Sequence, residues 1–233
     1  MNKAPIVLAI DTPDLTTAIA WVEATTDHVR VFKLGLEFFL TFGADGVKAI
    51  SSSTDADIFL DLKLHDIPHT VSGAAKAIAH LAPKYLTVHA SGGATMIRCA
   101  VEAVPQTHVT GVTILTSLAD QDVGALGFKA NALVTATVLA RVASSAGAGA
   151  IVCSPLEITA IRAAIGRDLI IITPGVRPEG SAGLDDQLRT MTPAAAIAAG
   201  ANLVVIGRPI TSLWPAGKSA MADKVQEIGA SLI

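Results

Sequence analysis

The sequence predicts an α/β protein that folds as a single (β/α)8 TIM barrel spanning residues 1–233. Short β-rich runs alternate with longer Ala-rich segments of helical character, which is the pattern of repeated βα units. The chain of 233 residues suits one barrel of about 250 residues and leaves little room for two domains. Apolar residues make up 51% and charged residues 16%, a balance typical of parallel strands buried on both faces.

Eight β-rich runs are predicted as strands, and eight parallel strands are enough to close a barrel. In chain order they are 6–11, 31–35, 58–64, 85–90, 109–116, 150–154, 169–175 and 203–208. The segments between them predict helices, including 71–82, 133–146 and 192–199. Expected N-caps of helices are Thr70, Ser91 and Thr192.

Two connections are longer than a tight βα turn requires, namely 117–131 and 174–191. Long βα loops of a barrel lie at its catalytic end. The second is rich in Gly, Pro and charge, and its stretch PGVRPEGSAG is a candidate lid, with a plain surface insertion as the alternative.

Composition excludes several classes of protein. A net charge of −3 and a pI near 6.0 leave no broad basic surface for nucleic acid. Asp11 ends the first apolar run and Arg141 splits the longest one, so neither a signal peptide nor a membrane span is expected. Cys99 and Cys153 lack metal-ligand spacing and are expected to be packing residues in a reducing compartment. A cytoplasmic protein without nucleic-acid or membrane partners is the expectation.

Charged residues gather at the predicted C-terminal ends of the strands, which is the functional end of such a barrel. Asp11 ends the first strand, Lys33 lies in the second, and Asp61 and Lys63 lie near the end of the third. Because a strand alternates its faces, Asp61 and Lys63 share one face, while the leucines between and beside them share the other and pack on helices. Both charges are therefore expected to point into the barrel mouth.

A buried charge without a partner is costly, whereas alternating positive and negative groups can hold each other ionised. The acids and lysines are therefore predicted to form one network. Inward ion pairs can also serve only to plug a barrel, which is the structural alternative. The accumulation of four charges at the catalytic end favours an active site.

A phosphate site is predicted after the eighth strand. The run VVIGRP brings Gly207 and Arg208 to a loop where barrels often bind phosphate through backbone N–H groups and a cation. Arg177 and Gln187, in the preceding long loop, could close over the same anion.

The segment FLDLKLHDIPHTV at 59–71 resembles the signature of the orotidine 5'-phosphate decarboxylase family. The core DLKLHD alone is shared with a wider suprafamily of phosphate-binding barrels, but the similarity extends along almost the whole chain. Further matching motifs are LAID at 8–11, FKLG at 32–35, TVHASGG at 87–93, ILTS at 114–117, VCS at 152–154, TPGVRP at 173–178 and VIGRPI at 205–210. His69 departs from the pattern, which usually has Asn there, and is interpreted as a surface or dimer-contact residue.

The resemblance implies cofactor-free and metal-free conversion of orotidine 5'-phosphate to UMP, with Lys63 as the proton donor. It implies that Asp61 lies beside the departing carboxylate, that Asp11 and Lys33 bind the ribose hydroxyls, and that a homodimer is the functional unit. Asp66 and Thr70 are expected to enter the neighbouring subunit's site, where Asp66 joins the catalytic charges. Other residues expected near the nucleotide or its phosphate are Thr116, Ser154, Arg177, Gln187, Gly207 and Arg208.

Two alternatives remain. The first is a suprafamily sugar-phosphate enzyme that forms an enediolate on Mg²⁺, whose oxygen ligands would include a carboxylate where this chain has Lys33. The second is a non-catalytic nucleotide-binding barrel, which would have no reason to bury a lysine between two aspartates. Turnover of orotidine 5'-phosphate with a chelator present would exclude both.

Overall fold

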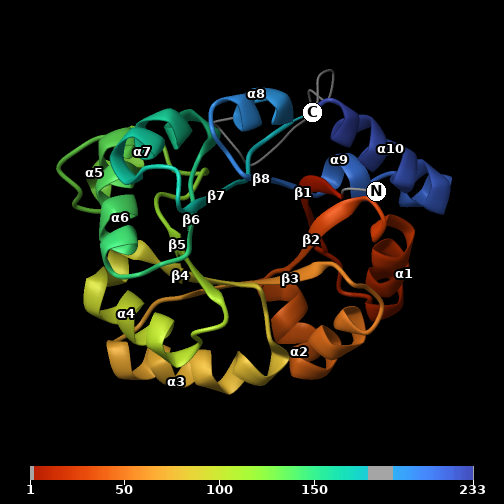
Figure 1. Cartoon of the computed structure of the whole chain (residues 1–233), viewed down its shortest axis with the longest axis horizontal. Helices are drawn as coiled ribbons and strands as arrows, with labels where there is room; N and C mark the ends of the chain where they lie inside the picture. The colour runs from red at the N-terminus through yellow and green to blue at the C-terminus, as the bar shows by residue number, and fades with distance from the viewer. Residues whose placement is uncertain (1–2, 178–190, 233) are drawn as a thin grey trace.

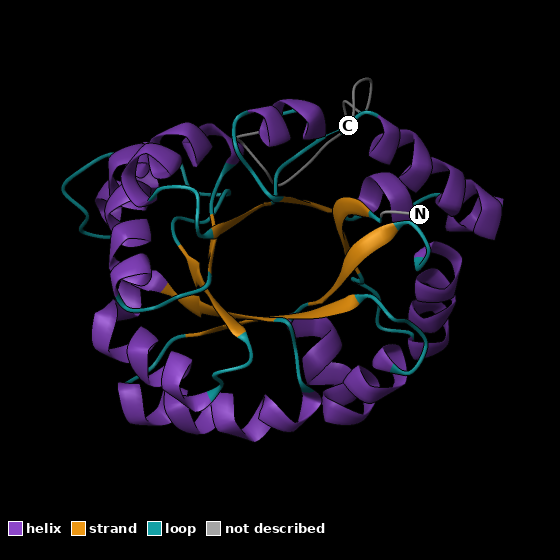
Figure 2. Ribbon diagram, viewed as in Figure 1, coloured by secondary structure: helices purple, strands orange, loops and turns teal. Residues whose placement is uncertain are grey.

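The computed structural model describes residues 3–177 and 191–232, and within them eight strands form one closed parallel barrel in the order β1 to β8. The strands are β1 Ala4–Ala9, β2 Val29–Leu34, β3 Asp57–Leu64, β4 Tyr85–His89, β5 His108–Val112, β6 Ala150–Val152, β7 Ile170–Thr173 and β8 Leu203–Ile206. Figure 2 shows the strands as an inner ring surrounded by helices. The predicted (β/α)8 barrel is confirmed.

Helices cover the outside of the barrel in chain order (Figure 1). They are α1 Leu15–Thr25, α2 Leu36–Ser51, α3 Pro68–Ile78, α4 Gly93–Ala103, α5 Asp120–Ala125, α6 Ala132–Ser145, α7 Ile158–Ile165, α8 Pro193–Ala198, α9 Arg208–Thr211 and α10 Lys218–Ala230. Short 3₁₀ turns are η1 Ala79–Leu81, η2 Ala90–Gly92, η3 Pro155–Glu157 and η4 Trp214–Ala216. The long connection 117–131 therefore contains a helix of its own, α5.

The core has two layers because each strand is buried on both faces. Phe59, Tyr85 and Ile172 pack together inside the barrel, whereas Leu60 and Leu86 pack in the layer between strands and helices. Burying a large apolar side chain contributes about 1.5–3 kcal/mol. The inner layer closes the barrel below its C-terminal mouth, so the mouth has an apolar floor.

Several predicted strands extend too far at their C-terminal ends. The fifth is the clearest case, because it was expected to reach Thr116 but β5 ends at Val112. Both the N–H and the hydroxyl of Thr113 donate to the carbonyl of Val152 instead. The residues that follow are apolar because they line a cavity and not because they form strand.

The structure confirms one of the three predicted helix N-caps. Thr192 accepts the N–H of Ala195 and caps α8. Thr70 is not a cap, because α3 already begins at Pro68, whose fixed φ suits the first helical turn. Ser91 is not a cap either, because it lies inside the turn η2 and Gly92 is the residue that precedes α4.

Other predictions concern thiols, the lid and membrane spans. Both cysteines are free, and Cys153 is buried as expected, while Cys99 is only partly buried. Most of the candidate lid, residues 178–190, lies outside the described residues. Among the helices that the structure describes, none has the length and apolar character needed to cross a membrane.

Candidate active site

A cavity of about 380 Å³ lies at the C-terminal ends of the strands, within the range of small-molecule sites. Most of the predicted site residues line it, namely Asp11, Lys33, Asp61, Lys63, Thr116, Arg177, Gly207 and Arg208. The sequence therefore predicted correctly which end of the barrel gathers these side chains.

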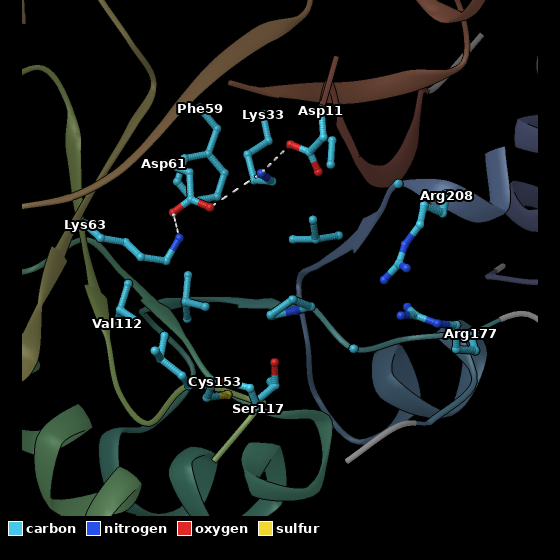
Figure 3. Close-up of a pocket in the computed structure, with 18 of the residues that line it drawn as sticks. Asp11, Lys33, Phe59, Asp61, Lys63, Val112, Ser117, Cys153, Arg177 and Arg208 are labelled. Carbon is cyan, nitrogen blue, oxygen red and sulfur yellow. Dashed lines mark hydrogen bonds and ion pairs between the residues drawn. The ribbon is translucent and has the colours of Figure 1, made fainter. Parts of the chain in front are cut away.

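Four charged side chains form an alternating chain along one wall of the cavity (Figure 3). The Lys63 Nζ lies 2.8 Å from Asp61 Oδ1, and the Lys33 Nζ lies 3.5 Å from Asp61 Oδ2. The same Lys33 Nζ lies 3.5 Å from Asp11 Oδ1. Both oxygens of Asp61 are thus occupied by ammonium groups, and the predicted network exists.

Barrel register brings these charges together. Ala9 pairs with Lys33, and Lys33 pairs with Phe59, so Asp61 lies one inward position above the level of Lys33. Gly35 directly follows β2, and a Cβ at this position would come within 3.3 Å of the Lys33 Nζ. A side chain at this glycine would therefore crowd the lysine.

The four side chains differ in exposure. Lys33 and Asp61 are 12% and 14% exposed, Lys63 is 29% exposed, and Asp11 is 60% exposed. Burial pushes the pKa of Asp61 upward, but Lys33, Lys63 and a hydrogen bond from Thr87 outweigh burial, and the pKa lies below its ordinary value. Asp61 is therefore a carboxylate at neutral pH, held between two cations.

Lys63 has a backbone conformation that the sequence pattern did not predict. Asp61 and Lys63 face the cavity and Leu60 and Leu62 join the outer core, as the alternation predicts. Lys63, however, has φ 50°, in the left-handed region that costs a non-glycine residue about 1–2 kcal/mol. A lysine kept there despite this cost is a sign of functional constraint.

The guanidinium groups of Arg177 and Arg208 lie across the cavity from Lys63 and face the same space (Figure 3). Arg208 follows Gly207 directly after β8, and Arg177 follows β7 closely. This end of the cavity therefore has two cationic groups of the kind that bind an anion. Gln187, predicted for the same anion, lies outside the described residues.

Three predicted residues do not line the cavity of their own chain. Asp66 and Thr70 are exposed, and Asp66 accepts the N–H of Ile67 at 2.6 Å. Ser154 is fully buried, and its backbone N–H donates to Glu157. The neighbouring Cys153 lines the cavity instead.

The cavity also has lining residues that sequence reasoning missed. They include Ser117, Cys153, Pro174, Val205 and Pro209. Most of them follow strand ends within a few residues, so their position relative to the predicted strands was the available signal. Their mixed chemistry gave no signal of its own.

The charged wall is the part of the cavity wall formed by Asp11, Lys33, Asp61 and Lys63. Two histidines lie next to it without lining the cavity. The rings of His65 and His89 have centroids 5.3 Å apart. Burial, together with the nearby His65 and Lys63, lowers the pKa of His89. His89 is therefore a neutral neighbour of the lysine at neutral pH, and His69 is an exposed residue of α3.

The model of the family described as "Orotidine 5'-phosphate decarboxylase / HUMPS family" matches residues 4–219. The chain belongs to this family. A relative named orotidine 5'-phosphate decarboxylase from Thermobifida fusca is 51% identical over 98% of both chains. One of the same name from Paramagnetospirillum magneticum is 45% identical over 95% of this chain and 97% of its own.

Solved structures agree with this family assignment. A crystal structure of orotidine 5'-phosphate decarboxylase from Lactobacillus acidophilus has a TM-score of 0.82 and 31% identity, with 99% of each chain covered. Membership in the orotidine 5'-phosphate decarboxylase family confirms the prediction that the chain is an enzyme, of the carboxy-lyase class.

Proposed function

We propose that this enzyme converts orotidine 5'-phosphate to UMP and CO₂ in pyrimidine biosynthesis, without a cofactor and with Lys63 as the proton donor. The observation that carries the proposal is the ammonium of Lys63, held 2.8 Å from Asp61 at the wall of a cavity whose far side has two guanidinium groups. A nucleotide placed with its phosphate at the arginines directs its base toward the lysine.

The phosphate end consists of Arg177, Arg208 and the backbone at Gly207, with Gln187 as a further expected contact. Guanidinium groups bind phosphate oxygens through paired N–H donors. Asp11 and Lys33, between the two ends, bind the ribose hydroxyls, and Thr116 lies near the nucleotide. Ser154 itself does not line the cavity, and its N–H and carbonyl both bond to Glu157, so the contact expected around Ser154 falls to the neighbouring Cys153, which does line it.

The reaction breaks the bond between ring carbon C6 and the carboxylate carbon. The electron pair stays on C6 as CO₂ leaves, and a proton from the Lys63 ammonium forms the new C–H bond. The lysine is left as a neutral amine and regains a proton from water. Because negative charge grows at C6 while the ammonium is already in place, no solvent has to reorient during the step.

Attraction between the Lys63 ammonium and the charge that develops at C6 accounts for part of the rate acceleration. At about 4 Å and an effective dielectric constant near 20, two unit charges interact by about 4 kcal/mol, or about three decades of rate. That is only part of what a decarboxylation without a cofactor needs. Binding energy from the remote phosphate supplies the rest by holding the base in a fixed position.

Asp61 has a second proposed role beside the departing carboxylate. Its pKa lies below the ordinary value, so the group stays charged where the substrate also has a negative charge. Repulsion between the two carboxylates would raise the energy of the bound substrate and fall as CO₂ leaves. Stabilisation of the transition state by Lys63 is the primary effect in this proposal.

A homodimer is the proposed functional unit, with Asp66 and Thr70 completing the neighbouring site. Both residues are exposed and lie outside the cavity of their own chain. Ile67 beside them is 65% exposed, and Leu40 on the helix after the adjacent strand β2 is 80% exposed. Large apolar side chains with this exposure are consistent with a partner surface.

The charges around Asp61 disfavour the alternative of an enzyme that forms an enediolate on Mg²⁺. Each oxygen of Asp61 already has an ammonium partner, and Lys33 would repel a divalent cation. In the part of the chain that the structure describes, no three His, Cys, Asp or Glu residues are grouped as metal ligands.

The proposed function predicts turnover of orotidine 5'-phosphate in the presence of excess EDTA. The ultraviolet absorbance of the pyrimidine should change at the same rate with and without the chelator, because no metal takes part. Complete loss of turnover in EDTA, restored by Mg²⁺, would contradict the proposal that the reaction needs no metal. Binding of the nucleotide without any spectral change would favour a non-catalytic barrel.

A further inference from the structure

A buried hydroxyl lies beneath the charged wall without lining the cavity. Thr87, in β4, is fully buried. Its Oγ1 accepts the backbone N–H of Lys63 at 2.8 Å and donates to Asp61 Oδ1 at 3.1 Å. One hydroxyl therefore contacts both members of the central ion pair.

The β3–β4 ladder explains why Lys63 needs this partner. Leu60 pairs with Leu86 and Leu64 pairs with Val88, so β3 advances four residues while β4 advances two. The extra residues interrupt the regular ladder and coincide with the left-handed conformation of Lys63. Its N–H, displaced from the ladder, finds an acceptor in the side chain of Thr87.

The hydrogen bonds form a closed ring. Because the hydroxyl of Thr87 accepts the Lys63 N–H, its single proton is directed at the Asp61 carboxylate. The same Asp61 Oδ1 also accepts from the Lys63 Nζ. Thr87 thereby holds Lys63 at its backbone directly and at its ammonium through Asp61.

We propose that Thr87 is a positioning residue that fixes the Lys63 ammonium at the reacting carbon, an inference that rests on the proposed function. Without the hydroxyl, the part-buried Lys63 N–H would lose its acceptor and the backbone would relax from its left-handed conformation. The Asp61 carboxylate would lose one of the donors that orient it. A displacement of about 1 Å at a reacting group can lower a rate about 100-fold.

The test compares Thr87→Val, which keeps the shape and removes the hydroxyl, with Thr87→Ser, which keeps the hydroxyl. Thr110→Val is the matched control, because Thr110 is equally buried on the adjacent strand β5 and its hydroxyl donates only to the carbonyl of His108. We expect Thr87→Val to lower kcat about 10- to 100-fold, with KM changed less than about threefold. Thr87→Ser should recover most of kcat, and Thr110→Val should leave it unchanged.

Equal kcat in Thr87→Val and wild type, or equal losses in Thr87→Val and Thr110→Val, would overturn the inference while the proposed function stood. An inactive wild type would instead overturn the proposed function. Crystal structures of wild type and Thr87→Val then still decide the inference, because an unchanged Lys63 backbone and Nζ would contradict it. If Thr87→Val does not fold, the same comparisons apply to Thr87→Ala.

Discussion

Replacing Lys63 by alanine is expected to lower kcat for orotidine 5'-phosphate by several orders of magnitude. The variant loses both the cation that faces the developing charge at C6 and the proton that C6 receives. UMP should still bind, because the arginines and the ribose contacts at the other end of the cavity remain. Steady-state kinetics and calorimetric titration with UMP together measure the two effects.

Lys48→Ala is the matched control for this variant. Lys48 is an exposed lysine of α2 whose partner is Asp45, three residues earlier on the helix surface, in a pair that is open to water. Removing it should change kcat by less than about twofold, since exposed ion pairs contribute little. Turnover retained in Lys63→Ala at the level of this control would remove Lys63 from its proposed role.

Co-expression of Lys63→Ala with Asp66→Ala is expected to restore activity that neither variant has alone. In a mixed dimer, one site receives Lys63 from one subunit and Asp66 from its partner, so it is intact. With random pairing, about one site in four is intact, and about a quarter of wild-type turnover should return. Two different affinity tags allow the mixed dimer to be purified and assayed.

The control for the mixed dimer is Lys63→Ala with Lys33→Ala. Both lysines line the cavity of their own chain, so no combination of these two subunits contains an intact site. No activity should return in that mixture. Equal recovery in the two mixtures, or none in either, would contradict the assignment of Asp66 to the partner's site.

The sequence predicted the barrel well because each strand has a strong local signal. Buried parallel strands are almost continuously apolar, and the helical segments between them are rich in alanine. Strand ends were predicted less accurately. Ile114 and Leu115 look like strand in the sequence, but they line the cavity beyond the end of β5. Apolar character reports burial and does not distinguish a strand from the wall of a pocket.

The charged wall was predictable for a related reason. Period-two alternation places Asp61 and Lys63 on one face of β3, and the structure confirms it. The left-handed conformation of Lys63 and its bond to Thr87 were not predictable, because they depend on the register between β3 and β4. Register is a tertiary property, and nothing in the local sequence of either strand specifies an interruption.

A crystal structure of the enzyme with UMP bound tests the central claim most directly. The account predicts that the Lys63 Nζ lies within about 3.5 Å of ring carbon C6, as a group poised for proton transfer must. It also predicts the phosphate between Arg177 and Arg208. A pyrimidine ring bound out of reach of the lysine, or an ammonium directed away from C6, would contradict it.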